Sequence, residues 1–282
     1  MKFKKLGALA ATCAAVAAFA LAGCGNSSAG TSAQSGSSDS GSEATTSEAG
    51  YKLVKDGTLT VGTSAEYEPF EYMKDGEYAG FDLELIQKIA EKLDLKVQYE
   101  NVDFDTIVPG VSSGSKYDVG IAAITVTPER KKEVDFSDAY YMDDQAIVTM
   151  KDNTDVTGDN YADKLNADGF KIAVQSGSTA EAFAKENFPK AELVPFKNAT
   201  DCFAALQSGQ ASALVTNRSV AAQMVSSAYQ NAQVVKQIST GEDYAIAVNK
   251  DNSKLKDDIN KALKELTDDG TVDSLMSKYN IK

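Results

Sequence analysis

The string SSGSKYDVGIAAIT, at residues 112–125, decides the fold class. Its Ser-Gly start predicts the end of a helix at Gly114, and the apolar run at 118–124 predicts a buried strand. A second string of the same order, QSGQASALVT, occupies residues 207–216. Because it also sets a helix end before a buried strand, the chain is predicted to contain two similar α/β units.

The flanking segments extend both units in the same order. Around the first string, strands are expected at 58–62 and 96–99, and helices at 81–93 and 106–112. Around the second, strands are expected at 170–175 and 191–196, and helices at 179–187 and 201–207. The alternation predicts an α/β fold of two lobes, each with a mainly parallel sheet covered by helices.

Two short apolar segments are expected to join the lobes. Residues 146–150 (AIVTM) and 244–248 (YAIAV) are predicted as hinge strands, and helices near 255–266 and 271–279 follow the second. Lobe one is therefore expected at 51–146 plus 245–282, and lobe two at 147–244. A ligand cleft is expected between them.

The first fifty residues are expected to lie outside the fold. Residues 1–23 have a basic start, an uncharged Ala-rich run and small residues at the end, which is typical of a secretory signal peptide. A membrane-spanning helix is the alternative, although about 17 residues is short for one. LAGC at 21–24 resembles the bacterial lipobox, so Cys24 is expected to carry lipid. Residues 24–50 are expected to be a disordered tether, because 25–50 contain no large apolar residue.

Composition excludes several classes of function. The chain has no His, which removes His-based nucleophile systems and His-ligated metals, and we expect no cofactor, no metal and no catalysis. The net charge of −13 argues against nucleic-acid binding. Once Cys13 and Cys24 are set aside, only Cys202 remains in the fold, where we expect a buried, inert thiol rather than a reactive one.

Arg130 and the SGST turn at 176–179 are the features of the expected cleft that point to an anion. Ligands of parallel sheets bind beyond the carboxyl ends of strands, near helix N-termini. Arg130 follows Thr127-Pro128-Glu129, where Thr is expected to cap a helix, and its guanidinium suits a carboxylate. The alternatives are a surface ion pair of Arg130 with Glu133 or Asp135, and a plain helix cap at SGST.

Several longer strings resemble one known family. They include GTSAEYEPFEY (62–72), VSSGSKYDVGIAAITVTPERKKEVDFSDAYY (111–141) and DDGTVDSLMSKY (268–279). They are similar to the extracellular solute-binding proteins for polar amino acids, the receptors of ABC importers. The resemblance implies a two-lobed, periplasmic-binding-protein-like fold of type II, with two hinge strands.

The resemblance also implies a binding site. Arg130, Thr125 and N–H groups near Thr125 and Thr179 would hold the ligand α-carboxylate. The ligand α-ammonium would meet the Ala123 carbonyl, the Thr125 hydroxyl and an acid of lobe two. The remaining expected binding residues contact the ligand's side chain or line the site: Ser64, Tyr67, Asp82, Phe104, Ala122, Gln175 and Ser178. For Asp82, helix N-capping is the alternative role.

One position departs from the family pattern. Asn217 stands where the lobe-two acid is expected, and an amide supplies no negative charge. Either a nearby acid compensates (Glu66, Asp82 or Asp143) or the ligand is less cationic at that end. Arg218, the neighbouring residue, would meet an acidic ligand side chain or remain solvated. Because Ser64 and Gln175 are neutral, glutamine or glutamate is the expected ligand.

The sequence thus predicts a monomeric, lipid-anchored receptor at the outer face of a bacterial cell membrane, which delivers a polar amino acid to an ABC importer permease. Two alternatives stay open. One is a dehydratase-like cleft enzyme using Glu66 as its acid, and the other is a ligand-sensing partner of a signalling protein.

Overall fold

The computed structural model describes Thr45–Thr46 and residues 50–281. The predicted signal peptide, Cys24 and nearly all of the expected tether lie outside the described residues. A short strand β1 (Thr45–Thr46) pairs with β2 (Lys52–Leu53) ahead of the first lobe. Among the residues that the structure describes, no helix combines the length and apolarity needed to cross a bilayer.

Lobe one is built on a five-stranded sheet in the order β7-β3-β8-β15-β9. The central β3 (Thr58–Thr63) is buried along its whole length and lies parallel to β7 (Lys96–Asn101) and β8 (Val119–Gly120). The antiparallel strand β15 (Ala247–Val248) joins β8 to β9 (Asp135–Phe136). A strand from the C-terminal part of the chain therefore completes the N-terminal sheet.

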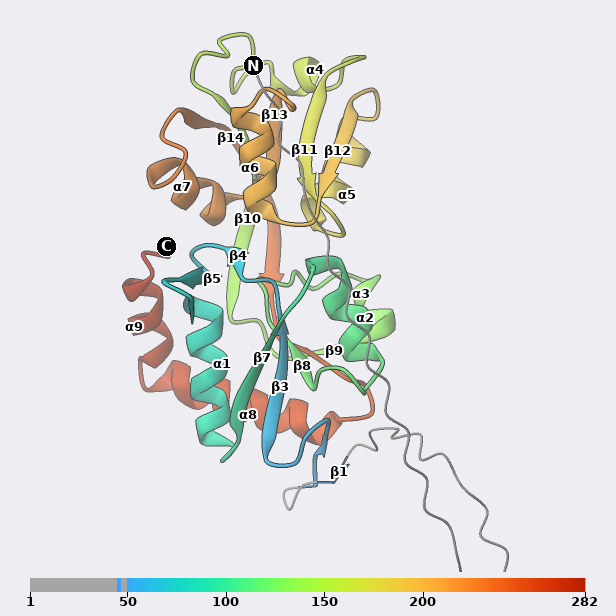
Figure 1. The fold of residues 1–282 in the computed structure, drawn as a ribbon, viewed down its shortest axis with the longest axis vertical. Helices are drawn as coiled ribbons and strands as arrows, with labels where there is room; N and C mark the ends of the chain where they lie inside the picture. Colours follow the sequence, from blue (N-terminus) through green and yellow to red (C-terminus); the bar gives the residue numbers. More distant parts are fainter. Residues whose placement is uncertain (1–44, 47–49, 282) are drawn as a thin grey trace, which may run out of the picture. The chain divides into compact units, whose positions relative to one another are not determined.

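Helices cover both faces of this sheet (Figure 1). One face carries α1 (Phe81–Lys92), α8 (Ser253–Asp268) and α9 (Thr271–Lys278), which contact one another. The other carries α2 (Ile107–Ser112), preceded by the short helix η1 (Phe104–Thr106), and α3 (Arg130–Glu133). Helix α1 matches its predicted range because its apolar residues recur at helical spacing and are buried, as Leu85, Ile86 and Ile89 are.

Lobe two repeats the arrangement with the order β12-β11-β13-β10-β14. Strand β11 (Lys171–Gln175) lies parallel to β12 (Glu192–Phe196) and β13 (Ala213–Asn217). Helices α5 (Thr179–Asn187) and α6 (Ala199–Gln207) pack on the sheet, α7 (Arg218–Ser226) follows β13 directly, and α4 (Tyr161–Leu165) precedes β11. The order β7-β3-β8 in lobe one matches the order β12-β11-β13 in lobe two. This is the arrangement expected of two copies of one α/β unit.

The strands that join the lobes are longer than predicted. Strand β10 (Tyr141–Met150) pairs antiparallel with β14 (Ala232–Tyr244), and Figure 1 shows both running between the lobes. The expected strand at 244–248 is divided, since β14 ends at Tyr244 and β15 begins at Ala247. The register of the pair shifts between Asp143 and Gln145, so this join contains a β-bulge.

Two further differences from the sequence prediction lie beside the cleft. The predicted strand at 118–124 is a strand only at Val119–Gly120, because Ala123 adopts a left-handed backbone with φ of 46°. A small sheet of β4 (Glu66–Tyr67), β5 (Glu71–Lys74) and β6 (Glu77–Ala79) was not predicted. It leads into α1 through Gly80, where a Cβ would lie 2.1 Å from the Phe70 carbonyl oxygen, so no side chain fits.

Candidate functional site

Arg130 lies at the start of α3 and reaches across to lobe two. Its Nη1 donates to the Thr125 carbonyl at 2.7 Å, and its Nη2 donates to the Gly177 carbonyl at 3.0 Å. The guanidinium lies over the Phe104 ring, 5.3 Å from its centroid. The Thr127 hydroxyl accepts from the Arg130 N–H at 3.2 Å, which is the predicted cap.

The charge of Arg130 has no direct partner of opposite sign in the described part of the chain. The ion pairs found among residues 50–281 include none to this guanidinium, so the alternative pairing with Glu133 or Asp135 is not what the structure shows. Burial lowers the pKa of Arg130, and the charge of Glu242 is the first influence that opposes this. A half-buried cation held by carbonyls is a strong attractor for a ligand carboxylate.

Glu242, near the end of β14, is the acid that sequence reasoning missed. Its side chain is buried, with 7% exposed. Its Oε2 accepts from the Thr125 hydroxyl at 2.8 Å and from the Thr179 hydroxyl at 2.6 Å. Its Oε1 accepts from Gln145 Nε2 at 2.5 Å and from the Thr240 hydroxyl at 3.2 Å. One carboxylate of a joining strand therefore binds side chains of both lobes.

Asn217, at the end of β13, also binds this carboxylate. Its Nδ2 donates to Glu242 Oε2 at 3.2 Å, and its Oδ1 accepts from the Tyr67 hydroxyl at 2.7 Å. The Tyr67 oxygen also lies 3.3 Å from the Thr216 hydroxyl oxygen. Burial raises the pKa of Tyr67, so the phenol keeps its proton and acts as the donor. Tyr67, one of the expected binding residues, here links lobe one to the end of β13.

The SGST turn serves as a helix cap and also supplies a site residue. Ser178 Oγ accepts from the Glu181 N–H at 3.1 Å and donates to the Gln175 carbonyl at 2.7 Å, so it caps α5. Thr179 instead directs its hydroxyl to Glu242. Gln175, 7% exposed, donates to the Lys197 carbonyl at 3.2 Å. The four-residue turn therefore both caps α5 and contacts Glu242 of the joining strand β14.

Asp82 does not have the helix-capping role that was considered as its alternative. It is fully buried in the first turn of α1, and Gly80 occupies the cap position. Its Oδ2 accepts from the Ala123 N–H and from the Tyr140 hydroxyl, each at 2.7 Å. Asp82 therefore fixes the left-handed backbone at Ala123, and its expected contact with a ligand side chain stays a prediction.

A buried acid pair lies under the same loop. Glu71, 1% exposed, is the neighbour of Asp82, and neither Glu71 Oε2 nor Asp82 Oδ1 has an ordinary donor. Burial raises the pKa of Asp82 to about 7, and burial together with the Asp82 charge raises that of Glu71 well above its usual value. A proton shared between the two carboxyls would give each of these oxygens a partner.

The other expected residues divide between cleft and core. Ala123 is 5% exposed, Ser64 is buried at the end of β3, and Phe104 supports the Arg130 guanidinium. Ala122 packs into the core of lobe one with Ile107 and Val111. The space where Tyr67 of lobe one meets Gln175, Ser178 and Thr216 of lobe two has no room even for a water molecule. Sites for small ligands usually enclose about 300 Å³ or more, so the lobes must part to admit one.

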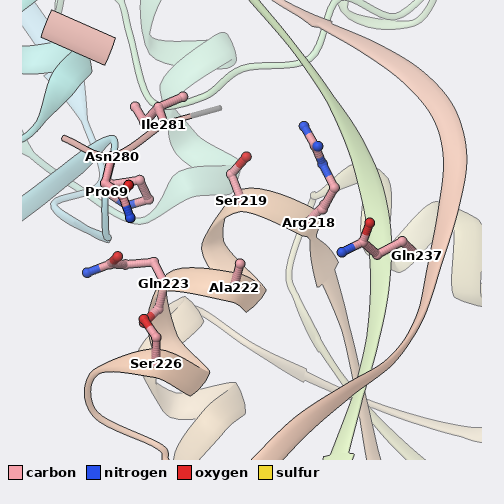
Figure 2. A pocket seen from close by; sticks show the side chains of 9 residues that line it. All are labelled: Pro69, Arg218, Ser219, Ala222, Gln223, Ser226, Gln237, Asn280 and Ile281. Atoms are coloured by element: carbon pink, nitrogen blue, oxygen red, sulfur yellow. The ribbon is translucent and has the colours of Figure 1, made fainter. Parts of the chain in front are cut away.

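Arg218 lies in a different place. Its Nε donates to Asp143 Oδ1 at 3.1 Å, and its Nη2 donates to the Tyr141 hydroxyl at 3.2 Å. Figure 2 shows it lining a separate pocket with Ser219, Gln223, Gln237 and Asn280. The residues that compensate for Asn217 thus do not include Asp143, whose carboxylate binds Arg218 and the Ser219 N–H.

Residues 59–282 match the family model of the bacterial extracellular solute-binding proteins, family 3. The chain belongs to this family. The solute-binding protein is 34% identical to the ABC transporter glutamine-binding protein GlnH of Bacillus subtilis (strain 168), over 72% of this chain and 73% of that one. The resemblance seen in the sequence is therefore confirmed.

Solved structures share the two-lobed fold. An ancestral arginine-binding protein bound to arginine superposes with a TM-score of 0.74 and 41% identity, covering 79% of this chain and 98% of that one. The ancestral amino acid-binding protein AncCDT-1, a precursor of cyclohexadienyl dehydratase, gives 0.73 and 40%, covering 79% and 95%. The predicted fold class is thereby confirmed for the solute-binding protein.

Proposed function

We propose that this solute-binding protein binds a free polar α-amino acid between its lobes and delivers it to the permease of an ABC importer. The observation that carries the proposal is Arg130, a half-buried cation that bonds carbonyls of both lobes and has no carboxylate partner among the described residues. A ligand carboxylate would supply the missing anion through a bidentate bond.

Glutamine is the ligand favoured first. Asp82 is buried beneath the Ala123 loop, so it offers no charge to a cationic side chain, and Ser64 and Gln175 are neutral. A relative named for glutamine supports this choice, whereas a structure neighbour named for arginine makes arginine the main competitor. Glutamate is the second choice of ligand, because its side chain has the same length as that of glutamine.

The mechanism is a conformational cycle in which no bond of the ligand is broken. Arg130, Thr125 and Tyr67 belong to lobe one, while Gly177, Thr179 and Asn217 belong to lobe two. A ligand that bonds groups of both lobes favours the form in which they meet. The long β10–β14 pair and its bulge are the hinge across which the lobes would part.

The enzyme alternative rests on Glu66 alone, and in the structure Glu66 accepts a hydrogen bond from the Thr200 hydroxyl. A single carboxylate is weak support for acid–base catalysis. The neighbour linked to a dehydratase is itself titled an amino acid-binding protein. Binding without chemistry is therefore the function we favour.

We further propose that Cys24 carries lipid and holds the protein at the outer face of the cell membrane as a monomer. The proposal rests on the lipobox-like LAGC string and on the family's extracellular members. The Cys24→Ser variant should be released into the culture medium, whereas the Cys13→Ser variant should stay with the cells. Retention of the Cys24 variant at the membrane would rule out the anchor.

Titration calorimetry of the purified protein against the twenty common amino acids tests the ligand proposal. Heat from one polar amino acid, or a small group of them, is expected. If none of the twenty amino acids gives heat of binding, the ligand proposal is contradicted.

A further inference from the structure

The negative charge that Asn217 lacks is present one hydrogen bond away. Glu242 Oε2 accepts from both groups expected to meet the ligand α-ammonium, the Thr125 hydroxyl at 2.8 Å and Asn217 Nδ2 at 3.2 Å. Glu66, Asp82 and Asp143, the acids considered from the sequence, bind other partners instead.

The groups that donate hydrogen bonds to the Glu242 carboxylate are all neutral. Glu242 receives hydrogen bonds from Thr125, Thr179, Asn217, Gln145 and Thr240, none of which carries charge. No cationic side chain of the described residues forms an ion pair with Glu242, so none competes there with a ligand ammonium.

The same bonds fix which atoms face a ligand. A carboxylate only accepts, so Thr125 must give its proton to Glu242, and the Thr125 oxygen lone pairs remain for another donor. Asn217 likewise turns its Nδ2 to Glu242 and its Oδ1 toward the Tyr67 hydroxyl, which leaves an Oδ1 lone pair. Both residues therefore present acceptors, as an ammonium requires.

Arg130 and Glu242 use opposite ends of Thr125. The guanidinium binds its carbonyl and the carboxylate binds its hydroxyl. A positive and a negative group flanking one residue match the carboxylate and ammonium that flank the α-carbon of an amino acid.

We infer that Glu242 is the acid that selects for the ligand α-ammonium, acting through Thr125 and Asn217 as a positioning residue. This inference rests on the proposed function, because it needs an amino acid in the cleft. The competing role is a latch, in which Glu242 merely ties Thr125 of lobe one to Thr179 of lobe two.

Paired probes separate these roles. The probes are L-glutamine with 4-carbamoylbutanoic acid, its analogue without the α-ammonium, and L-arginine with 5-guanidinopentanoic acid. In Glu242→Gln, the affinity for the amino acid that binds should fall roughly 10- to 100-fold, as expected for one lost charge interaction. The affinity for its deamino analogue should change less than about threefold, since that probe lacks the charged group.

Two further variants act as control and rescue. Asp243→Asn removes the same charge from the exposed neighbouring residue and should bind like the wild type. Asn217→Asp places a second carboxylate about 3.2 Å from Glu242 Oε2 and should not strengthen binding. The double variant Asn217→Asp/Glu242→Gln moves the charge to position 217 and should restore the preference for the α-ammonium.

The outcomes are distinct. If Glu242→Gln loses affinity only for the amino-acid probe and the double variant restores it, the inference is supported. Equal loss for both members of a probe pair identifies a latch and overturns it, as does an unchanged affinity. If the wild type binds no amino acid, the proposed function fails and the inference falls with it. Thermal unfolding of each variant shows that the fold is intact.

Discussion

At the scale of single residues, the site depends on groups buried behind those that would touch a ligand. Asp82 holds the Ala123 N–H from beneath, and Glu242 orients Thr125 and Asn217. The family resemblance pointed to the residues that face the cleft, because those belong to recognisable strings. It did not reveal Glu242, whose one signal in the sequence is an acid two residues before the apolar run at 244–248.

The Glu71–Asp82 pair makes stability depend on pH. Both pKa values are raised in the folded protein, so the protonated pair contributes stability that is lost as pH rises through the folded values. The wild type should lose free energy of unfolding between about pH 5 and 8, at up to about 1.4 kcal/mol per pH unit for each proton released. Chemical denaturation across this range measures the effect.

The variant Glu71→Gln should flatten that dependence, because its amide can donate to Asp82 Oδ1 and does not titrate. Glu77→Gln, an exposed acid on the next strand, serves as the control and should keep the wild-type slope. If the Glu71 variant retains the wild-type slope, the two carboxyls do not share a proton.

At the scale of elements, the sequence predicted the helices better than the joining strands. Residues 179–187 form a helix over the predicted range because apolar spacing and the Ser178 cap agree. Residues 232–243 mix polar, charged and apolar side chains, and half-exposed strands of this kind give no clear alternation. The predicted strand at 118–124 stops at Gly120, and the backbone beyond it is held by Asp82. Because Asp82 is distant in sequence, no local pattern could predict this.

Gly177, in the turn between β11 and α5, offers an element-scale test of lobe closure. It has a φ of 71°, and a Cβ there would lie 2.8 Å from Asp105 Cβ across the cleft. Gly177→Ala should therefore oppose contact of the lobes by about 1–3 kcal/mol, weakening ligand affinity by roughly 5- to 100-fold. Titration calorimetry gives the affinity.

Gly169→Ala is the matched control for this turn. Its φ is 76°, so it carries the same backbone strain, but nothing lies within 4 Å of an added Cβ. It should lower the melting temperature of lobe two without changing affinity. Equal affinity in the two variants would show that this turn does not limit closure.

At the scale of the whole molecule, side chains on either side of the cleft tie the two lobes together. Tyr67 bonds Asn217, Gln223 donates to Glu68 at 2.9 Å, and Arg130 bonds Gly177. Where Tyr67 meets lobe two there is no room for a ligand, so the lobes would have to part before one could enter. A bound amino acid would therefore contact both lobes at the same time.

Calorimetric titration of Arg130→Ala against the amino acid that the wild type binds tests this claim most directly. Lys131→Ala, which removes the same charge from the exposed next residue, is the control. We predict wild-type affinity for the Lys131 variant and a loss of about 100-fold or more for the Arg130 variant, as removal of one member of a buried charge pair causes. Wild-type affinity in a folded Arg130 variant would contradict the account.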